Sequence, residues 1–102
     1  MMLRPRFTSA FKKDRKRAGR RGKDIERLDA MMRRLANEEQ LEPRYRDHKL
    51  VGEWRDCREC HIEADWLLVY LVSGDEITFV RTGTHSDLFD ELRRDEARPV
   101  TA

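Results

Sequence analysis

Three histidines, an aspartate and an arginine are the residues of this chain best suited to moving protons and binding phosphate. They are His48, His61, Asp65, Arg81 and His85. An imidazole titrates near neutral pH, so it can serve as a general base or a general acid. RNA cleavage needs both, because a base removes the 2′-OH proton and an acid protonates the leaving 5′-oxygen. A planar guanidinium can stabilise the extra charge that develops on phosphorus.

Strand topology predicts that these residues meet. The second half of the chain contains three strand-like runs, which cover residues 54–60, 66–72 and 77–82. Ser73-Gly74-Asp75 is typical of a hairpin turn between the last two. In a meander, the end of the first run, the start of the second and the end of the third share one edge of the sheet. The positions at that edge are His61, Asp65, Trp66, Arg81 and His85. His48 lies in a loop just before the meander, within reach of the same place.

Two aromatic residues near this edge allow two interpretations. Trp66 and Phe89 can stack on the unpaired bases of single-stranded RNA. Large aromatic side chains beside a strand are also common members of a hydrophobic core. An isolated histidine or aspartate at a strand end is likewise often a structural turn residue. The convergence of five such groups favours a functional site.

The segment 57–61 matches C-x-x-C-H, the attachment pattern of c-type haem. Haem attachment requires export, and two cysteines three positions apart in a strand point to opposite faces. A zinc site would need His48 or His85 to join Cys57, Cys60 and His61, and the chain has no second C-x-x-C motif. We therefore expect neither a metal nor a cofactor.

The N-terminal region predicts a strand followed by a helix. Residues 2–7 favour a short strand, and Pro5 places it at an edge of the sheet. Thr8 or Ser9 is expected to cap a helix that reaches about Ala18, after which glycines end it.

Two further helices are expected. Asp24 can cap a helix that extends to about Glu39. Its apolar face consists of Ile25, Leu28, Met31, Met32 and Leu35. A short C-terminal helix is expected over 85–92, with Thr84 and Asp87 spaced as a capping box. The predicted fold is α+β, with two N-terminal helices packed on one antiparallel sheet. Residues 1–92 form a single domain, and 93–102 form a polar tail.

Charge is abundant and unevenly distributed. Charged residues make up 41% of the chain, against about 25% in an average soluble domain. Residues 1–23 contain ten Lys/Arg and one acid, whereas residues 51–102 contain six Arg and twelve Asp/Glu. Such a basic segment favours a polyanion or an acidic protein as partner. No apolar run approaches a membrane span and the N-terminus lacks a signal-peptide core, so we expect a cytoplasmic protein with reduced cysteines.

Three stretches of the chain form an ordered set of motifs. They are residues 47–50 with Gly52, residues 57–70 and residues 81–89. This set strongly resembles the YafQ branch of the RelE/ParE superfamily of type II toxins, and the resemblance covers about residues 2–89. Lys49 and Ala64 depart from it, since the family often has proline at both positions, and the Ala64 change can loosen the turn that holds His61 and Asp65.

The resemblance implies a RelE-like fold and a ribosome-dependent endoribonuclease that cleaves mRNA and is neutralised by a DinJ-like antitoxin. The positions that match the family's catalytic residues are His48, His61, Asp65 and His85. Those that match phosphate-binding or substrate-placing residues are Arg81, Trp66 and Phe89. Our hypothesis is that His85 is the general acid and that His48 or His61, with Asp65, serves as base or orienting group.

The basic first helix gains a role from this resemblance. A cationic face binds phosphates without regard to sequence, which suits ribosomal RNA. The residues expected to contact the ribosome are Lys12, Lys13, Lys16 and Arg17. Two alternatives remain: a ParE-like toxin that inhibits gyrase without cutting RNA, and a non-catalytic RNA-binding or ribosome-associated module.

Overall fold

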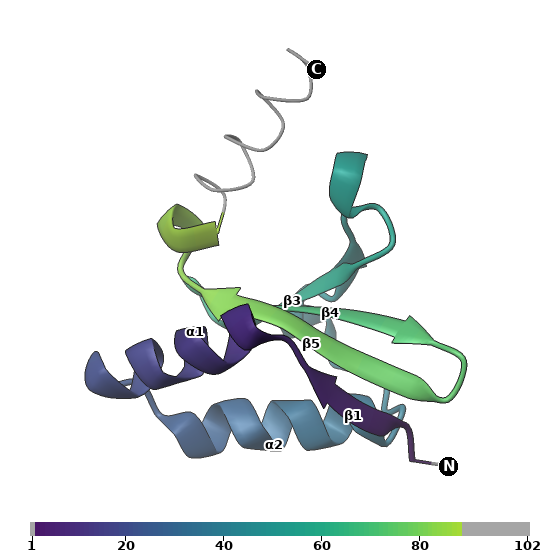
Figure 1. Ribbon diagram of the computed structural model, residues 1–102, viewed down its shortest axis with the longest axis horizontal. Helices are drawn as coiled ribbons and strands as arrows, with labels where there is room; N and C mark the ends of the chain where they lie inside the picture. The colour runs from purple at the N-terminus through teal and green to yellow at the C-terminus, as the bar shows by residue number, and fades with distance from the viewer. Residues whose placement is uncertain (1, 89–102) are drawn as a thin grey trace.

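Two helices cover one face of a five-stranded sheet (Figure 1). The computed structural model describes residues 2–88. The helices are α1 (Ser9–Arg20) and α2 (Ile25–Ala36), and two short 3-10 turns are η1 (Pro43–Tyr45) and η2 (Gly52–Trp54). The strands are β1 (Arg4–Phe7), β2 (His48–Lys49), β3 (Arg58–Glu63), β4 (Trp66–Ser73) and β5 (Glu76–Gly83). The α+β prediction is confirmed.

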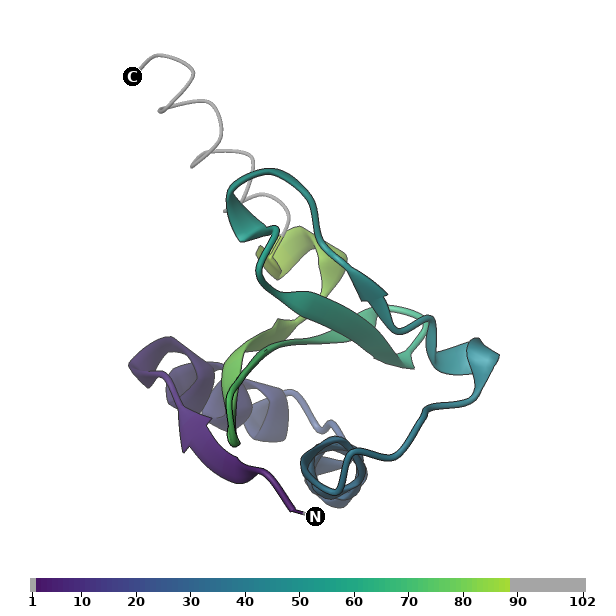
Figure 2. The same cartoon turned by 90° about the vertical axis from the view of Figure 1, so that its right-hand side faces the viewer.

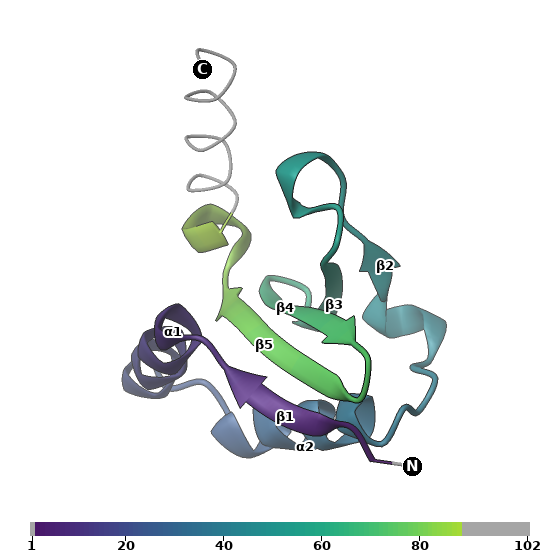
Figure 3. The ribbon, with the colours of Figure 1, turned by 45° about the vertical axis from the view of Figure 1, so that its right-hand side comes forward.

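The sheet has the order β1-β5-β4-β3-β2 (Figure 3). The predicted antiparallel meander is present as β3, β4 and β5. β1 pairs with β5 in parallel, so the sheet is mixed rather than wholly antiparallel. Side chains explain this register, because Arg4 and Arg6 lie beside the carboxylate of Glu76 and Phe7 stacks on Phe79. β1 is an edge strand, as Pro5 predicted.

Both long helices begin at the predicted caps. Thr8 Oγ1 accepts the Phe11 N–H at 2.9 Å, and the Asp24 carboxylate accepts the Arg27 N–H at 3.3 Å. The second helix ends at Ala36, three residues before the expected end. Its five predicted apolar positions are all buried or packed against the core. Figure 2 views this helix end-on beneath the sheet.

The first strand of the meander lies later than the sequence pattern suggested. The Cys57 N–H donates to the Trp54 carbonyl at 2.8 Å, which turns the chain through the residues expected to start that strand. β3 therefore begins at Arg58 and continues to Glu63, where it meets Trp66 of β4. The shift toward Glu63 is set by the pairing partners in β4, which a local pattern does not contain.

Apolar side chains form a cluster on each face of the sheet. The larger cluster lies between the sheet and the helices and includes Cys60, Trp66 and Leu68. The smaller one lies on the other face and includes Leu67, Val69 and Leu88. Neighbouring residues of β4 thus alternate between the two clusters. Because α1 and α2 pack on the larger cluster, they leave the face with the smaller cluster uncovered.

The chain becomes helical again at His85 and remains so to Leu88, the last described residue. The predicted capping box is confirmed, because the Asp87 N–H donates to Thr84 Oγ1 and the Thr84 N–H donates to the Asp87 carboxylate, each at 3.0 Å. Phe89, the rest of the predicted C-terminal helix and the 93–102 tail lie outside the described residues. Neither α1 nor α2 has the length and apolar character that crossing a bilayer requires.

Candidate active site

The three histidines and Asp65 come together on the face of the sheet that α1 and α2 leave open. His61 pairs with Leu67 in register, and Leu67 belongs to the cluster on that face. The centroids of the His61 and His85 rings are 5.6 Å apart, and those of His48 and His61 are 6.4 Å apart. Side chains that are 37 positions apart in sequence, from His48 to His85, thus border one small surface.

Asp65 fixes the position of His85. One carboxylate oxygen, Oδ1, accepts the backbone N–H of His85 at 2.8 Å and lies 2.5 Å from ring atom Nδ1. The two hydrogen bonds to the carboxylate from His85 hold the pKa of Asp65 below its usual value, so Asp65 stays ionised. With Nδ1 committed to Asp65, Nε2 is the ring nitrogen that can exchange a proton with a substrate.

His48, like His85, is oriented through its ring atom Nδ1. Its Nδ1 lies 2.6 Å from the carbonyl oxygen of Arg46, and a carbonyl can only accept, so Nδ1 carries the proton. Nε2 then points toward the other groups of the site. His48 lies in the two-residue strand β2, paired with Glu59 of β3, and not in the loop that the sequence suggested.

A fifth ionisable group, Glu59, lies under the histidines and was not singled out by the sequence. Its Oε2 is 3.5 Å from His48 Nε2 and 3.8 Å from His61 Nε2. The residue is 2% exposed, and Oε1 has no hydrogen-bond partner among the described residues. Burial raises the pKa of Glu59, and the charges of His48 and His85 partly offset this shift. At these distances the carboxyl group can interact electrostatically with the imidazoles above it.

His61 is the most enclosed of the three imidazoles, with a side chain that is 12% exposed. Its burial lowers its pKa below 6.5, and the charge of His85 adds to this, as does that of Arg46. A neutral imidazole at neutral pH is the form that accepts a proton. His61 therefore suits the base, and His85, oriented by Asp65, suits the acid.

Arg81 extends toward α1. Its guanidinium binds the carboxylate of Asp14, with Nε 2.6 Å from Oδ2 and Nη2 3.1 Å from Oδ1. Asp14 also accepts the Thr82 N–H and pairs with Arg17. Any phosphate contact by Arg81 has to compete with this carboxylate.

Trp66 belongs to the core. It is 1% exposed, and its indole N–H donates to Thr82 Oγ1 at 3.0 Å, which in turn donates to the Leu67 carbonyl at 2.7 Å. The ring therefore has no face on which a base could stack, and the core interpretation of Trp66 replaces that of a substrate contact. The apolar run that begins at Trp66 was the signal that favoured burial.

The basic face of α1 is only partly available. Lys12, Lys13 and Lys16 are exposed, as expected of a surface that contacts RNA. Arg17 differs, because it is half-buried and pairs with Asp14 and Asp87. The three lysines are thus free to meet phosphates, whereas Arg17 helps to hold α1 on the sheet.

The two cysteines are buried on opposite faces of the sheet, as their spacing predicted. Cys60 belongs to the larger cluster and Cys57 to the smaller. Both are free thiols. Burial raises the pKa of each, Cys60 most strongly, so they stay protonated. Side chains on opposite faces cannot bind one ion together, and no group of three metal-binding side chains forms within residues 2–88.

The model of the family described as "Bacterial toxin of type II toxin-antitoxin system, YafQ" matches residues 3–90 of this chain. The chain belongs to the YafQ family. Its relative "mRNA interferase toxin YafQ" from Escherichia coli strain K12 is 39% identical over 84 residues, which cover 81% of this chain and 91% of the relative. mRNA interferases are endoribonucleases, so the family placement agrees with a site built from an acid and a base.

Solved structures that are similar to this chain have the same fold. The crystal structure of the E. coli DinJ–YafQ toxin–antitoxin complex matches with a TM-score of 0.81 and 37% identity, over 87% of this chain and 99% of that one. A copper-bound mutant toxin from Helicobacter pylori matches with a TM-score of 0.81 and 40% identity, over 85% of this chain and 99% of that one. The RelE-like α+β fold expected from the resemblance is confirmed.

Proposed function

We propose that this YafQ-family toxin is a ribosome-dependent endoribonuclease that cleaves mRNA by acid–base transesterification. The observation that carries the proposal is the cluster of three imidazoles on one open face, with His85 fixed through Nδ1 by Asp65. Acid and base are both side chains of this cluster, so the reaction needs no metal.

In the proposed reaction, neutral His61 or His48 removes the proton of a ribose 2′-OH. The 2′-oxygen attacks the adjacent phosphorus, and the bond from phosphorus to the 5′-oxygen breaks. Protonated His85 gives its Nε2 proton to that leaving oxygen, which leaves a 2′,3′-cyclic phosphate and a 5′-hydroxyl. Asp65 holds the acid in place, and Glu59 lies close enough to stabilise the positive charge of His48 or His61 once either has taken up the proton.

Single-turnover cleavage of ribosome-bound message tests the acid. Replacing His85 with alanine should slow cleavage by about 10²–10⁴-fold, the usual contribution of a positioned acid or base. The fold should survive, because the His85 side chain is 42% exposed. Near-normal cleavage by His85→Ala would show that another group protonates the leaving oxygen.

Ribosome dependence is tested by mapping new 5′ ends on a message with and without translating ribosomes. We expect ends to form only on ribosome-bound message. Cleavage of free message at the same rate would contradict the ribosome requirement. Absence of new ends in both samples would favour a non-cleaving toxin, either one that acts on gyrase or a non-catalytic RNA-binding module.

We also propose that a DinJ-like antitoxin neutralises this chain. The support is the pair of E. coli crystal structures in which a YafQ toxin is in complex with DinJ, together with the basic surface here, which suits an acidic partner. A small acidic protein encoded next to this chain should co-purify with it and suppress cleavage at a stoichiometric ratio.

A further inference from the structure

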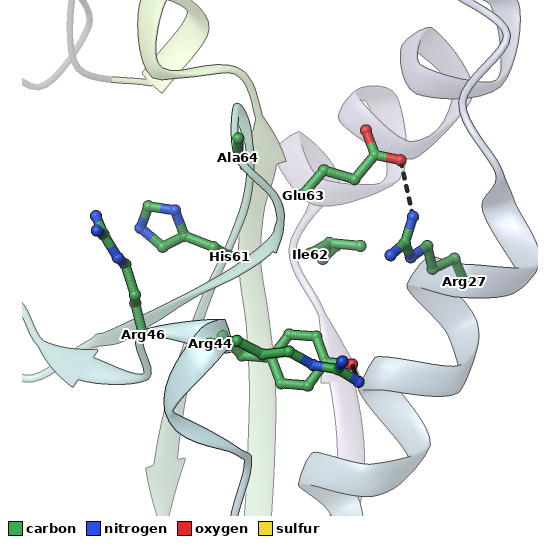
Figure 4. Close-up of a pocket in the computed structure, with 8 residues that line it drawn as sticks. Arg27, Arg44, Arg46, His61, Ile62, Glu63 and Ala64 are labelled. Carbon is green, nitrogen blue, oxygen red and sulfur yellow. Dashed lines mark hydrogen bonds and ion pairs between the residues drawn. The ribbon is translucent and has the colours of Figure 1, made fainter.

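A pocket of about 460 Å³ opens beside His61, outside the imidazole cluster (Figure 4). α2 contributes Arg27 on one side, and the η1 segment contributes Arg44, Tyr45 and Arg46 on the other. The end of β3 and Ala64 of the following turn form the rest of the wall. Figure 4 shows the guanidinium of Arg46 next to the His61 ring. The pocket is therefore continuous with the catalytic surface.

The charge of this pocket is positive and only partly neutralised. Its one acid, Glu63, pairs with Arg27 at 3.3 Å and with Lys23 at 3.1 Å. Arg44 donates to the Tyr45 hydroxyl at 2.8 Å, which is a neutral partner. Among the described side chains no ion pair joins Arg44 or Arg46 to a carboxylate, although Glu42, whose pKa is lowered chiefly by its hydrogen bond with Arg34, is also affected by the charge of Arg44. Two guanidinium charges in the pocket are thus available to bind an anion.

Local structure holds the guanidinium of Arg44 and the backbone of Arg46. Arg44 lies over the Tyr45 ring, with its guanidinium carbon 4.8 Å from the centroid. Arg46 has a left-handed backbone, with φ 50° and ψ 43°, a conformation that a non-glycine residue rarely adopts. Its N–H donates to the Pro43 carbonyl at 3.0 Å, and its carbonyl orients His48. One turn therefore positions a catalytic imidazole and a cation together.

We propose that this pocket binds the RNA nucleotide next to the scissile phosphate, with one flanking phosphate on Arg46, beside His61, and the other on Arg44, on the α2 side of the pocket. This inference rests on the proposed nuclease function and adds a subsite to it. The volume suits a small-molecule-sized group, and guanidinium forks match phosphate oxygens. Direct contact with His61 favours a segment of the RNA over an acidic segment of a protein.

Binding of a non-cleavable RNA tests the subsite. A short oligoribonucleotide with 2′-O-methyl groups lacks the nucleophile, and its affinity for the full chain can be followed by fluorescence anisotropy. Arg44→Gln and Arg46→Gln together should weaken binding by about tenfold or more, since two charge-assisted contacts are lost. The salt dependence of binding should also flatten, by about 0.7 in log–log slope for each phosphate contact removed.

Arg33→Gln is the matched control, because Arg33 is an exposed arginine of α2 that does not line the pocket. It removes one charge and should leave affinity nearly unchanged. Equal weakening by the control would overturn the subsite in favour of a general charge effect. No measurable binding by the unaltered chain would overturn it too, and so would a double variant that binds RNA normally but no longer binds an acidic partner protein.

Failure of the subsite and failure of the nuclease proposal give different results. His85→Ala should bind the 2′-O-methyl RNA normally and lose cleavage. The double arginine variant should need more substrate for half-maximal single-turnover cleavage, with less change in the maximal rate. If His85→Ala cleaved normally while the arginine variant still bound RNA weakly, the acid assignment would be wrong and the subsite would stand.

Discussion

At the scale of single residues, different surroundings give two histidines different roles, one as base and one as acid. His61 is enclosed and faces other cations, which lowers its pKa, while His85 is half exposed and held by a carboxylate. An acid and a base that work at one pH need such different surroundings. The loop residue Arg46 takes part, since its charge and its carbonyl act on His61 and His48 respectively.

The pH dependence of cleavage should reveal this base. His61 accepts a proton only while neutral, so the single-turnover rate should fall as pH drops through a midpoint below 6.5. Arg46→Gln removes one of the charges that lower this pKa and should move the midpoint toward higher pH. Arg44→Gln lies in the same pocket and should not move it. A midpoint above 6.5 in the unaltered chain would exclude His61 as the base.

Glu59 should destabilise the folded chain near neutral pH. Its pKa is raised above 4.5 on folding. Its contribution to the stability of the folded chain is therefore fully present below pH 4.5 and is lost as pH rises through the folded-state pKa. Glu59→Gln should therefore be more stable by roughly 1 kcal/mol at pH 7–8, the scale of a buried polar group without a partner. The gain should disappear near pH 4. Urea unfolding of both proteins across this range measures the difference, and a constant difference would contradict it.

Trp66→Phe distinguishes a core residue from a substrate contact. The substitution keeps an aromatic ring but removes the indole N–H that donates to Thr82. We expect the free energy of unfolding to fall by about 1–2 kcal/mol. The substrate concentration for half-maximal cleavage should stay unchanged. A large rise in that concentration without loss of stability would place Trp66 at the substrate after all.

At the scale of elements, the meander brings the acid, its partner and His61 to one edge of the sheet. The β3–β4 turn carries Asp65, and the chain after β5 carries His85. α1 is fastened beside β5 through Asp14, which is 4% exposed and binds Arg17, Arg81 and the Thr82 N–H. One carboxylate thus joins a helix to the strand that leads to His85.

Asp14→Asn should cost about 3 kcal/mol of stability, because it removes the buried carboxylate charge that Arg81 and Arg17 both bind. Asp29→Asn is the control. Asp29 pairs with Arg15 at 2.7 Å, but both side chains are about a third or more exposed, with values of 35% and 42%, so its loss should cost less than about 1 kcal/mol. Urea midpoints compare the two variants. Equal effects would show that the Asp14 network does not fasten α1.

At the scale of the whole molecule, α1 presents a cationic surface of its own. The exposed lysines of α1 form a cationic face apart from the imidazole cluster, and Figure 3 shows α1 on the β5 side of the sheet, away from β2. Ribosomal RNA and the message can therefore contact different surfaces. Counterion release makes such a contact depend strongly on salt.

Replacing Lys12, Lys13 and Lys16 with glutamine should weaken ribosome binding and reduce its log–log salt slope by about 2–3. Arg17 is left in place because it pairs with buried acids, and its loss would mix stability with binding. Sedimentation with ribosomes at several salt concentrations gives the slope. An unchanged slope would exclude this face from the contact.

The sequence by itself determined the features that depend on near neighbours in the chain. Helix caps, the apolar face of α2, the Thr84–Asp87 capping box and the alternation that separates Cys57 from Cys60 all follow from short-range spacing. Meander topology even predicted that His61, Asp65 and His85 would meet. Tertiary structure decided which groups are buried beside which. The burial of Glu59, the capture of Arg81 by Asp14 and the pocket at Arg46 depend on residues distant in sequence, because desolvation and charge act through space and no local pattern contains them.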